Sequence, residues 1–261
     1  MNEIKISLLH LALKPGAMQH NFALIEQGVR IAAASGADLV IAPELCISGY
    51  QFIDLAGTDW IGIHPDAWTT QICRLAKSLE LTILFGHAER DAAGNLYNSA
   101  FMVDAGGMIV GHHRKINTHA DQWSSAGQVV EPVTWNGLKV GMLICADAYT
   151  EKIAGTLQSK GAELLISPAA WGPGLYGPEG EWEQRTVETG LPLVVCNRTG
   201  KELSLDFSDA ESLVIKNGKR LLWYRSPSSA VLTFDWSIGQ MSPISNEFLV
   251  QRTLKILKVA D

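Results

Sequence analysis

The order of short apolar segments and amphipathic segments is the feature of this sequence that most restricts its fold. Residues 4–11 have the pattern of a buried strand, and residues 17–36 place apolar side chains at alternating steps of four and three, as on one face of a helix. A second strand segment, 37–43, precedes a helix that opens at Pro65, a residue favoured in the first helical turn. Strands that alternate with helices in this way predict an α/β fold.

The middle of the chain differs, because turns and not helices separate its strand segments. Turn-forming residues at 91–95 and 104–107 flank strand segments 97–103 and 108–115, which predicts an antiparallel meander. This mixture suits two facing mixed sheets with helices on their outer faces, an α-β-β-α four-layer sandwich. We expect further strands at 138–145, 163–167, 191–197 and 230–236, a hairpin of 211–216 and 219–224 around Asn217-Gly218, and helices at 150–160, 179–189 and 246–257.

The composition is that of a globular protein. Of the 261 residues, 47% are hydrophobic and 18% are charged, which is enough for a buried core and too apolar for a disordered chain. No linker, low-complexity run or repeat interrupts the sequence. We therefore expect a single domain over residues 1–261, with residues 240–261 as a C-terminal tail.

The charge of the chain indicates which classes of binding partner to expect, and its cysteines indicate the cellular compartment. The net charge of −6, without a stripe of lysine and arginine, argues against nucleic acid or an anionic membrane surface as the partner. No apolar run approaches about 18 residues, and the N-terminal residues resemble a strand more than a signal peptide. The four cysteines are scattered without a C-x-x-C pair, as reduced thiols are. We expect a cytoplasmic protein with no membrane contact.

Three strand segments end in a residue that can do chemistry: Glu44, Lys115 and Cys145. Ligand sites of α/β sheets lie at the carboxyl ends of strands, so these side chains can converge although they are far apart in sequence. A thiol with a pKa near about 8.5 needs a base or a nearby cation to become a nucleophile at neutral pH. Glu44 could take the proton, while Lys115 and the Ala146 N–H could stabilise an oxyanion. The spacing of these residues alone leaves other interpretations open. Cys145 could be a small buried hydrophobic residue, Glu44 could mark an ordinary end of a strand, and Lys115 could be a solvated loop residue.

Five blocks in order give a more specific signal, because together they resemble the nitrilase superfamily of carbon–nitrogen hydrolases from about residue 4 to about residue 236. The resemblance implies the four-layer sandwich, sheets paired across a homodimer, and a Glu44–Lys115–Cys145 triad with a thioester or thioimidate intermediate. It implies no metal and no organic cofactor. The blocks are 42–50 (APELCISGY), 113–116 (HRKI), 141–147 (GMLICAD), 168–171 (PAAW) and 196–200 (CNRTG).

The sequence departs from this family pattern at two places. Many members carry a second glutamate after the lysine block, but residues 117–127 (NTHADQWSSAG) contain none, and Ala126 stands where proline is usual. Asp121 is the best substitute and a possible fourth catalytic residue. Ala146 replaces a common aromatic residue, which should open space beside the nucleophile.

Other candidate sites carry less weight. His112, His113 and His119 could suggest a metal, but adjacent residues of a strand point to opposite faces, so we expect no metal site. Tyr50, Trp171 and Tyr176 are candidates for substrate binding. Trp171 and Tyr176, like Trp182, could equally be packed aromatic residues. Arg185 and Glu188, three residues apart on a helix, are expected to form an ion pair. Cys46, Cys73 and Cys196 are interpreted as core residues, which leaves Cys145 as the only essential thiol.

These observations favour an amidase that hydrolyses non-peptide C–N bonds of small linear amides and releases ammonia and a carboxylate. A nitrilase or an N-carbamoyl amidohydrolase on the same triad is the alternative. The aspartate after Ala146 favours the amidase modestly, because the resemblance associates true nitrilases with Trp-Glu after the cysteine. A catalytically silent binding protein on this fold and a cysteine peptidase with a histidine partner are the rivals from other classes. The expected partners are a small amide or nitrile substrate and a second copy of the chain.

Overall fold

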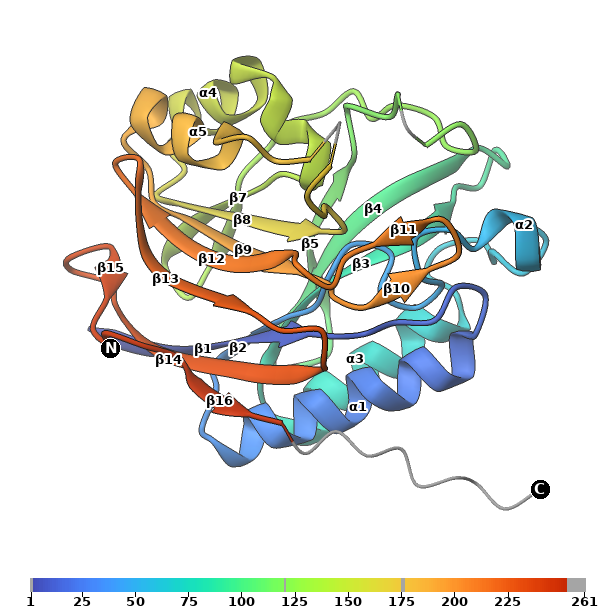
Figure 1. The fold of residues 1–261 in the computed structure, drawn as a ribbon, viewed down its shortest axis with the longest axis horizontal. Helices are drawn as coiled ribbons and strands as arrows, with labels where there is room; N and C mark the ends of the chain where they lie inside the picture. Colours follow the sequence, from blue (N-terminus) through green and yellow to red (C-terminus); the bar gives the residue numbers. More distant parts are fainter. Residues whose placement is uncertain (1, 120, 175–176, 253–261) are drawn as a thin grey trace.

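Two β-sheets lie face to face in the computed structural model, which describes residues 2–119, 121–174 and 177–252 (Figure 1). In the first sheet, β1, β2 and β3 are parallel, while β4 and β14 run antiparallel to their neighbours. Its strands, in spatial order, are β15 (Ser242–Pro243), β14 (Ala230–Ser237), β1 (Glu3–His10), β2 (Leu39–Ile41), β3 (Thr82–Arg90), β4 (Leu96–Val103) and β5 (Ile109–Arg114), and β16 (Leu249–Gln251) also pairs with β14.

The second sheet has a parallel centre and antiparallel edges. The Asn217-Gly218 turn joins its two outermost strands on one side, as the sequence predicts. In spatial order its strands are β13 (Lys219–Arg225), β12 (Glu211–Lys216), β9 (Leu193–Asn197), β8 (Leu164–Ala169), β7 (Leu138–Met142) and β6 (Val133–Trp135), and a small separate hairpin pairs β10 (Lys201–Glu202) with β11 (Leu205–Asp206).

Helices cover the outer face of each sheet, which confirms the predicted four-layer sandwich (Figure 1). Helices α1 (Met18–Ala34) and α3 (Ala67–Leu79) cover the first sheet, and α4 (Glu151–Ser159) and α5 (Glu181–Thr189) cover the second. The Asp66 carboxylate caps α3 by accepting the Thr69 N–H at 2.8 Å. Two short elements, α2 (Ile53–Ala56) and the 3₁₀ helix η1 (Cys145–Tyr149), lie on connections. Among the described helices, none is long and apolar enough to cross a membrane.

The largest core lies between the two sheets, where alternate residues of the facing strands meet. Ile6 and Leu8 of β1 and Leu84 of β3 share one buried cluster with Val140 of β7 and Val194 of β9. Burying each such side chain stabilises the fold by roughly 1.5–3 kcal/mol, so this layer fixes how the sheets sit on one another. A second cluster fills the space between the first sheet and helices α1 and α3.

The C-terminal segment differs from the prediction. We expected a helix over residues 246–257, but residues 249–251 form strand β16, which pairs antiparallel with β14. Backbone hydrogen bonding to a sheet edge therefore outweighs the helical spacing of the apolar side chains, and Leu249 is exposed. Residues 246–248 and 252 are not helical either, and residues 253–257 lie outside the described residues.

Candidate active site

The structure brings Glu44, Lys115 and Cys145 to one place from two sheets. Glu44 follows β2 and Lys115 follows β5 in the first sheet, whereas Cys145 follows β7 in the second. All three residues are buried, with relative exposures of 0%, 1% and 4%. Lys115 Nζ lies 2.7 Å from Glu44 Oε1. The predicted convergence at the carboxyl ends of strands is thus observed for both sheets.

The backbone has an unusual conformation just after β2, which leads to Glu44, and just after β7, which leads to Cys145. Leu45, directly after Glu44, and Cys145 itself each have a φ of 47°, a left-handed conformation uncommon for non-glycine residues. Such strain persists where the surrounding structure holds it in place, and it occurs often at functional sites. Gly86 of β3 makes room for the first of these turns, because a Cβ at this position would lie 2.6 Å from the Glu44 Cα.

Two carboxylates share one ammonium group and one amide group. Lys115 Nζ donates to Glu44 Oε1 and, at 2.9 Å, to Asp121 Oδ2. Asn98 Nδ2 donates to the same two oxygens, at 2.8 Å each. Tyr50 Oη donates to the other oxygen of Asp121 at 3.0 Å. Asp121 therefore lies where it can orient Lys115, as the sequence suggests for a substitute of the second glutamate.

Burial and neighbouring charges act in opposite directions on Lys115 and Glu44. Burial alone would lower the pKa of the Lys115 ammonium, but the carboxylates of Glu44 and Asp121 hold its pKa well above the usual value. Burial raises the pKa of Glu44, and the opposing attraction of Lys115 only partly offsets this. The site therefore contains a fixed cation beside a carboxylate that binds a proton more readily than an exposed one.

The surroundings of the Cys145 thiol favour its protonated form. Burial raises its pKa well above the usual value, and the nearby Glu44 carboxylate raises the pKa further, while Lys115 lowers it. A buried thiol of this kind needs a base at the moment of attack. The Glu44 carboxylate lies next to the thiol, since a hydrogen bond between the two side chains contributes to the shift.

A buried aspartate, Asp147, connects the loop after β5 to the start of η1. Its Oδ1 accepts the N–H groups of Ile116 and Asn117, both at 2.9 Å. Its Oδ2 accepts the Ile144 N–H at 2.9 Å and lies 2.8 Å from His113 Nε2. Burial would raise the pKa of Asp147, but these donors, His113 first, lower it. One carboxylate thus fixes the backbone beside both the lysine and the cysteine.

Sequence reasoning missed Asn98, the Ala170 N–H and the linking role of Asp147. Asn98 is a fully buried polar residue in β4, and the Ala170 N–H donates to Glu44 Oε2 at 2.9 Å. An asparagine inside a largely apolar strand is a signal in the sequence, because buried amides need partners. A backbone donor leaves no such signal, since its position depends on the fold of both sheets.

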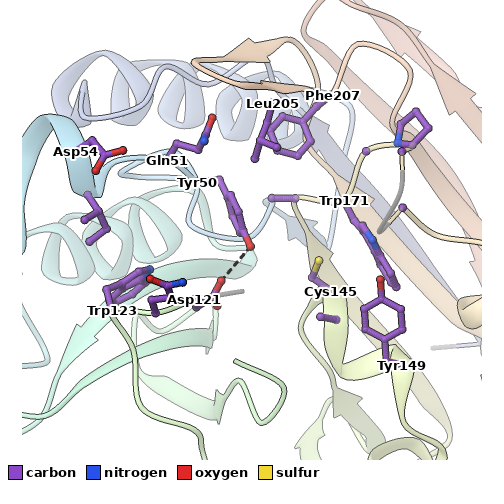
Figure 2. Close-up of a pocket in the computed structure, with 18 residues that line it drawn as sticks. Tyr50, Gln51, Asp54, Asp121, Trp123, Cys145, Tyr149, Trp171, Leu205 and Phe207 are labelled. Atoms are coloured by element: carbon purple, nitrogen blue, oxygen red, sulfur yellow. Dashed lines mark hydrogen bonds between the residues drawn. The ribbon is translucent and has the colours of Figure 1, made fainter. Parts of the chain in front are cut away.

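A cavity of about 600 Å³ opens beside Cys145 (Figure 2). Tyr50 and Trp171, two of the three candidates for substrate binding, line it, and the third, Tyr176, lies outside the described residues. Trp182 instead packs behind Trp171, edge to face at 5.0 Å between ring centroids. Figure 2 shows Cys145, Tyr149 and Trp171 on one wall and Tyr50, Gln51 and Asp54 on the other. The lining also includes Ile53, Asp121, Gln122, Trp123, Ala146, Ala170, Gly172, Pro173, Gly174, Gly177, Leu205 and Phe207.

Among the described residues, no histidine lines this cavity, and Cys145 is the only cysteine that does. His112 contacts Glu89 at 2.8 Å and His113 contacts Asp147, so the two rings point to opposite faces of β5. All four cysteines are free. Cys46 and Cys196 are buried as expected, whereas Cys73 is only half-buried, on α3. Arg185 and Glu188 form the expected ion pair at 2.8 Å.

The fold and the site can be compared with those of the carbon–nitrogen hydrolases. The chain belongs to that family, because the family model for carbon–nitrogen hydrolases matches residues 5–230. A Pseudomonas protegens protein described as a hydrolase in the pqqF 5′ region is 28% identical over 84% of this chain and 79% of its own length. A nitrilase of Pyrococcus abyssi is 30% identical over 77% of this chain and 78% of its own.

Solved structures show the same fold. An amidase from Nesterenkonia sp. superposes with a TM-score of 0.80 at 22% identity, over 90% of each chain. The family match and this superposition confirm the predicted superfamily and the predicted sandwich.

Proposed function

We propose that this carbon–nitrogen hydrolase is an amidase that cleaves small linear amides through Cys145, with Glu44 as general base and Lys115 as oxyanion stabiliser. One observation carries the proposal: a pocket-lining thiol lies beside a buried carboxylate–ammonium pair joined at 2.7 Å. A thiol nucleophile, a base whose pKa is raised and a fixed cation are the three groups that acyl transfer needs.

In acylation, the Cys145 thiol proton moves to Glu44 as Sγ forms a bond to the amide carbon. The carbonyl oxygen becomes an oxyanion, which accepts hydrogen bonds from Lys115 Nζ and the Ala146 N–H. The C–N bond then breaks, the proton passes from Glu44 to the leaving nitrogen, and ammonia departs from a thioester. Ala146 lines the pocket next to Cys145, which suits its N–H to this role.

In deacylation, Glu44 removes a proton from water, and the water oxygen attacks the thioester carbon. The C–S bond breaks, the thiolate takes the proton back from Glu44, and the carboxylic acid leaves. Asp121 acts here as a positioning residue, because it and Glu44 hold Lys115 Nζ between them. The Tyr50 hydroxyl fixes the second oxygen of Asp121 on the pocket side.

The same three residues could act on a nitrile or an N-carbamoyl compound. The similarity to a protein named as a nitrilase supports the nitrile as an alternative substrate. We also propose a homodimer, as the family resemblance implies, although residues 249–251 of the expected C-terminal arm pair with β14 of their own subunit. Light scattering at micromolar protein concentration tests the assembly, and a monomer would contradict it.

Intact-mass spectrometry during turnover of small amides, nitriles and N-carbamoyl compounds tests the function. We expect ammonia release from linear amides, with an acyl adduct on Cys145 that disappears as substrate is consumed. Iodoacetamide should inactivate the enzyme with one label, on Cys145. The Cys145→Ala variant is the control and should be inert, so full activity in this variant would exclude the mechanism.

A further inference from the structure

The segments that line the pocket carry negative charge and no positive charge. They cover the described residues 50–54, 121–123, 145–149, 170–174, 177 and 205–207, and none of these residues is a lysine, arginine or histidine. The cation beneath the pocket, Lys115, is already held by two carboxylates. A substrate with a carboxylate or phosphate away from the reacting carbonyl would therefore find no counter-charge among the described lining residues.

Asp54 lies on the wall that faces Cys145 across the pocket (Figure 2). It is an exposed residue of the short helix α2, so its carboxylate is accessible to a ligand in the pocket. A charge at the rim of a concave site attracts ligands of opposite sign and repels those of like sign. Asp54 is thus placed to act on the end of a substrate remote from the reacting carbonyl.

Aromatic side chains cover much of the wall between these two ends. Tyr50 and Phe207 meet edge to face at 6.3 Å between centroids, and Tyr149 and Trp171 meet at 4.8 Å. Together with Trp123 they line the pocket. Aromatic faces accommodate alkyl chains and attract ammonium groups, whereas the negative face of an aromatic ring repels an anion.

We propose that Asp54 is a specificity-determining residue and that the substrate is an amide or ureido compound with a protonated amine at its remote end. The proposal rests on the proposed function for the identity of the reacting group. The scissile carbonyl lies at Cys145, the alkyl chain crosses the aromatic wall, and the ammonium group lies beside Asp54. Among substrates with the same reacting group, the charge at the remote end determines which one the enzyme prefers.

The test compares three amides of equal chain length: an ω-amino amide, its neutral alkyl isostere and the ω-carboxy amide. We expect kcat/KM to be about 3- to 5-fold higher for the cationic amide than for the neutral one, and the anionic amide to be the poorest, in line with one exposed charge pair. Raising the ionic strength from about 0.01 M to about 1 M shortens the Debye length from about 30 Å to about 3 Å and should remove most of the preference.

Two variants assign the preference to one carboxylate. Asp54→Asn should reduce the cationic-to-neutral ratio to below about 2-fold through KM, with kcat unchanged, because the remote end takes no part in the chemical step. Asp59→Asn is the matched control: it removes the same charge from an exposed aspartate of the same segment that does not line the pocket, and it should keep the ratio.

Equal kcat/KM values for the three amides, or the same loss in both variants, would overturn the proposal. Calorimetric binding of the three amides to the Cys145→Ala protein separates this from a failure of the proposed function. If no amide is hydrolysed by the unmodified enzyme, the function is wrong, yet tighter binding of the cationic amide would still support the role of Asp54. Binding that is indifferent to charge would reject that role even if hydrolysis is observed.

Discussion

At the scale of single residues, Glu44 and Lys115 act on the Cys145 thiol in opposite directions. Glu44 raises the pKa of the thiol and Lys115 lowers it. A catalytic base and an electrostatic stabiliser can therefore be told apart by two measurements, the rate of turnover and the titration of the thiol.

We expect Glu44→Gln and Lys115→Met each to lose turnover by roughly 100- to 1,000-fold, the usual cost of removing one group that acts in the transition state. Their effects on the thiol should differ in sign. The pH midpoint of Cys145 alkylation by iodoacetamide should fall in Glu44→Gln, because a negative charge is lost, and rise in Lys115→Met, because a positive charge is lost. Mass spectrometry of the label at a series of pH values gives both midpoints.

Asp121→Asn should lie between these variants and the unmodified enzyme in turnover, since Glu44 still holds Lys115. The fold of each variant is checked by circular dichroism. If this buried pair had only a structural role, removing one partner would lower stability by about 3–5 kcal/mol and leave the rate of the folded protein intact. Near-normal turnover in both Glu44→Gln and Lys115→Met would therefore rule out the triad.

At the scale of secondary-structure elements, Asp147 joins the loop after β5 to η1 through four hydrogen bonds. In Asp147→Asn one oxygen becomes an NH₂ group that faces N–H donors, which costs on the order of 1–3 kcal/mol of stability. Because the bonds fix the backbone beside Lys115 and Cys145, we expect kcat to fall at least about 10-fold with little change in KM. Steady-state kinetics and urea unfolding measure the two effects.

Asp66→Asn is the control for this effect. Asp66 is also a buried carboxylate that caps a helix and contacts a histidine, His87, at 3.0 Å, but it lies outside the pocket lining. Its loss should lower stability while kcat stays near normal. If both variants lose kcat equally, Asp147 has only a structural role.

The elements also show which parts of the molecule the sequence could predict. Strands ending in Glu44, Lys115 and Cys145 were recognisable, because apolar runs and strand-end chemistry are local patterns. The helix expected near the C-terminus was wrong over 249–251, because pairing with a distant strand is invisible to local spacing. The partners Asn98 and Ala170 N–H were missed for the same reason: each meets Glu44 only when separate elements pack.

At the scale of the whole molecule, buried His10 bridges the two sheets. Its Nδ1 lies 3.0 Å from Ser212 Oγ on β12, and its Nε2 lies 3.1 Å from the Ser226 carbonyl oxygen. Burial lowers the pKa of His10 from 6.5 to about 4, although its hydrogen bonds oppose the shift. The folded protein thus holds a neutral imidazole over a pH range in which the unfolded chain binds a proton.

The stability from His10 is complete above about pH 6.5 and is lost as the pH falls toward about 4. At about 1.4 kcal/mol per pKa unit, this loss amounts to about 3 kcal/mol. Urea unfolding at about pH 7 and about pH 4 measures it. His10→Gln should show a smaller acid loss than the unmodified protein, whereas the exposed control His119→Gln should show the same loss. An unchanged acid loss in His10→Gln would assign the effect to other groups.

The division of the site between two sheets also bears on how such an enzyme can be tuned. Ile41, just before the Glu44 turn, and Met142, just before the Cys145 turn, both belong to the inter-sheet core. A volume change in that layer alters the spacing of the sheets, and a misplacement of about 1 Å can cost about 100-fold in rate. Variation among packed apolar residues, far from any substrate, is therefore a route by which evolution or a protein engineer can adjust the speed of this reaction without altering a single reacting group.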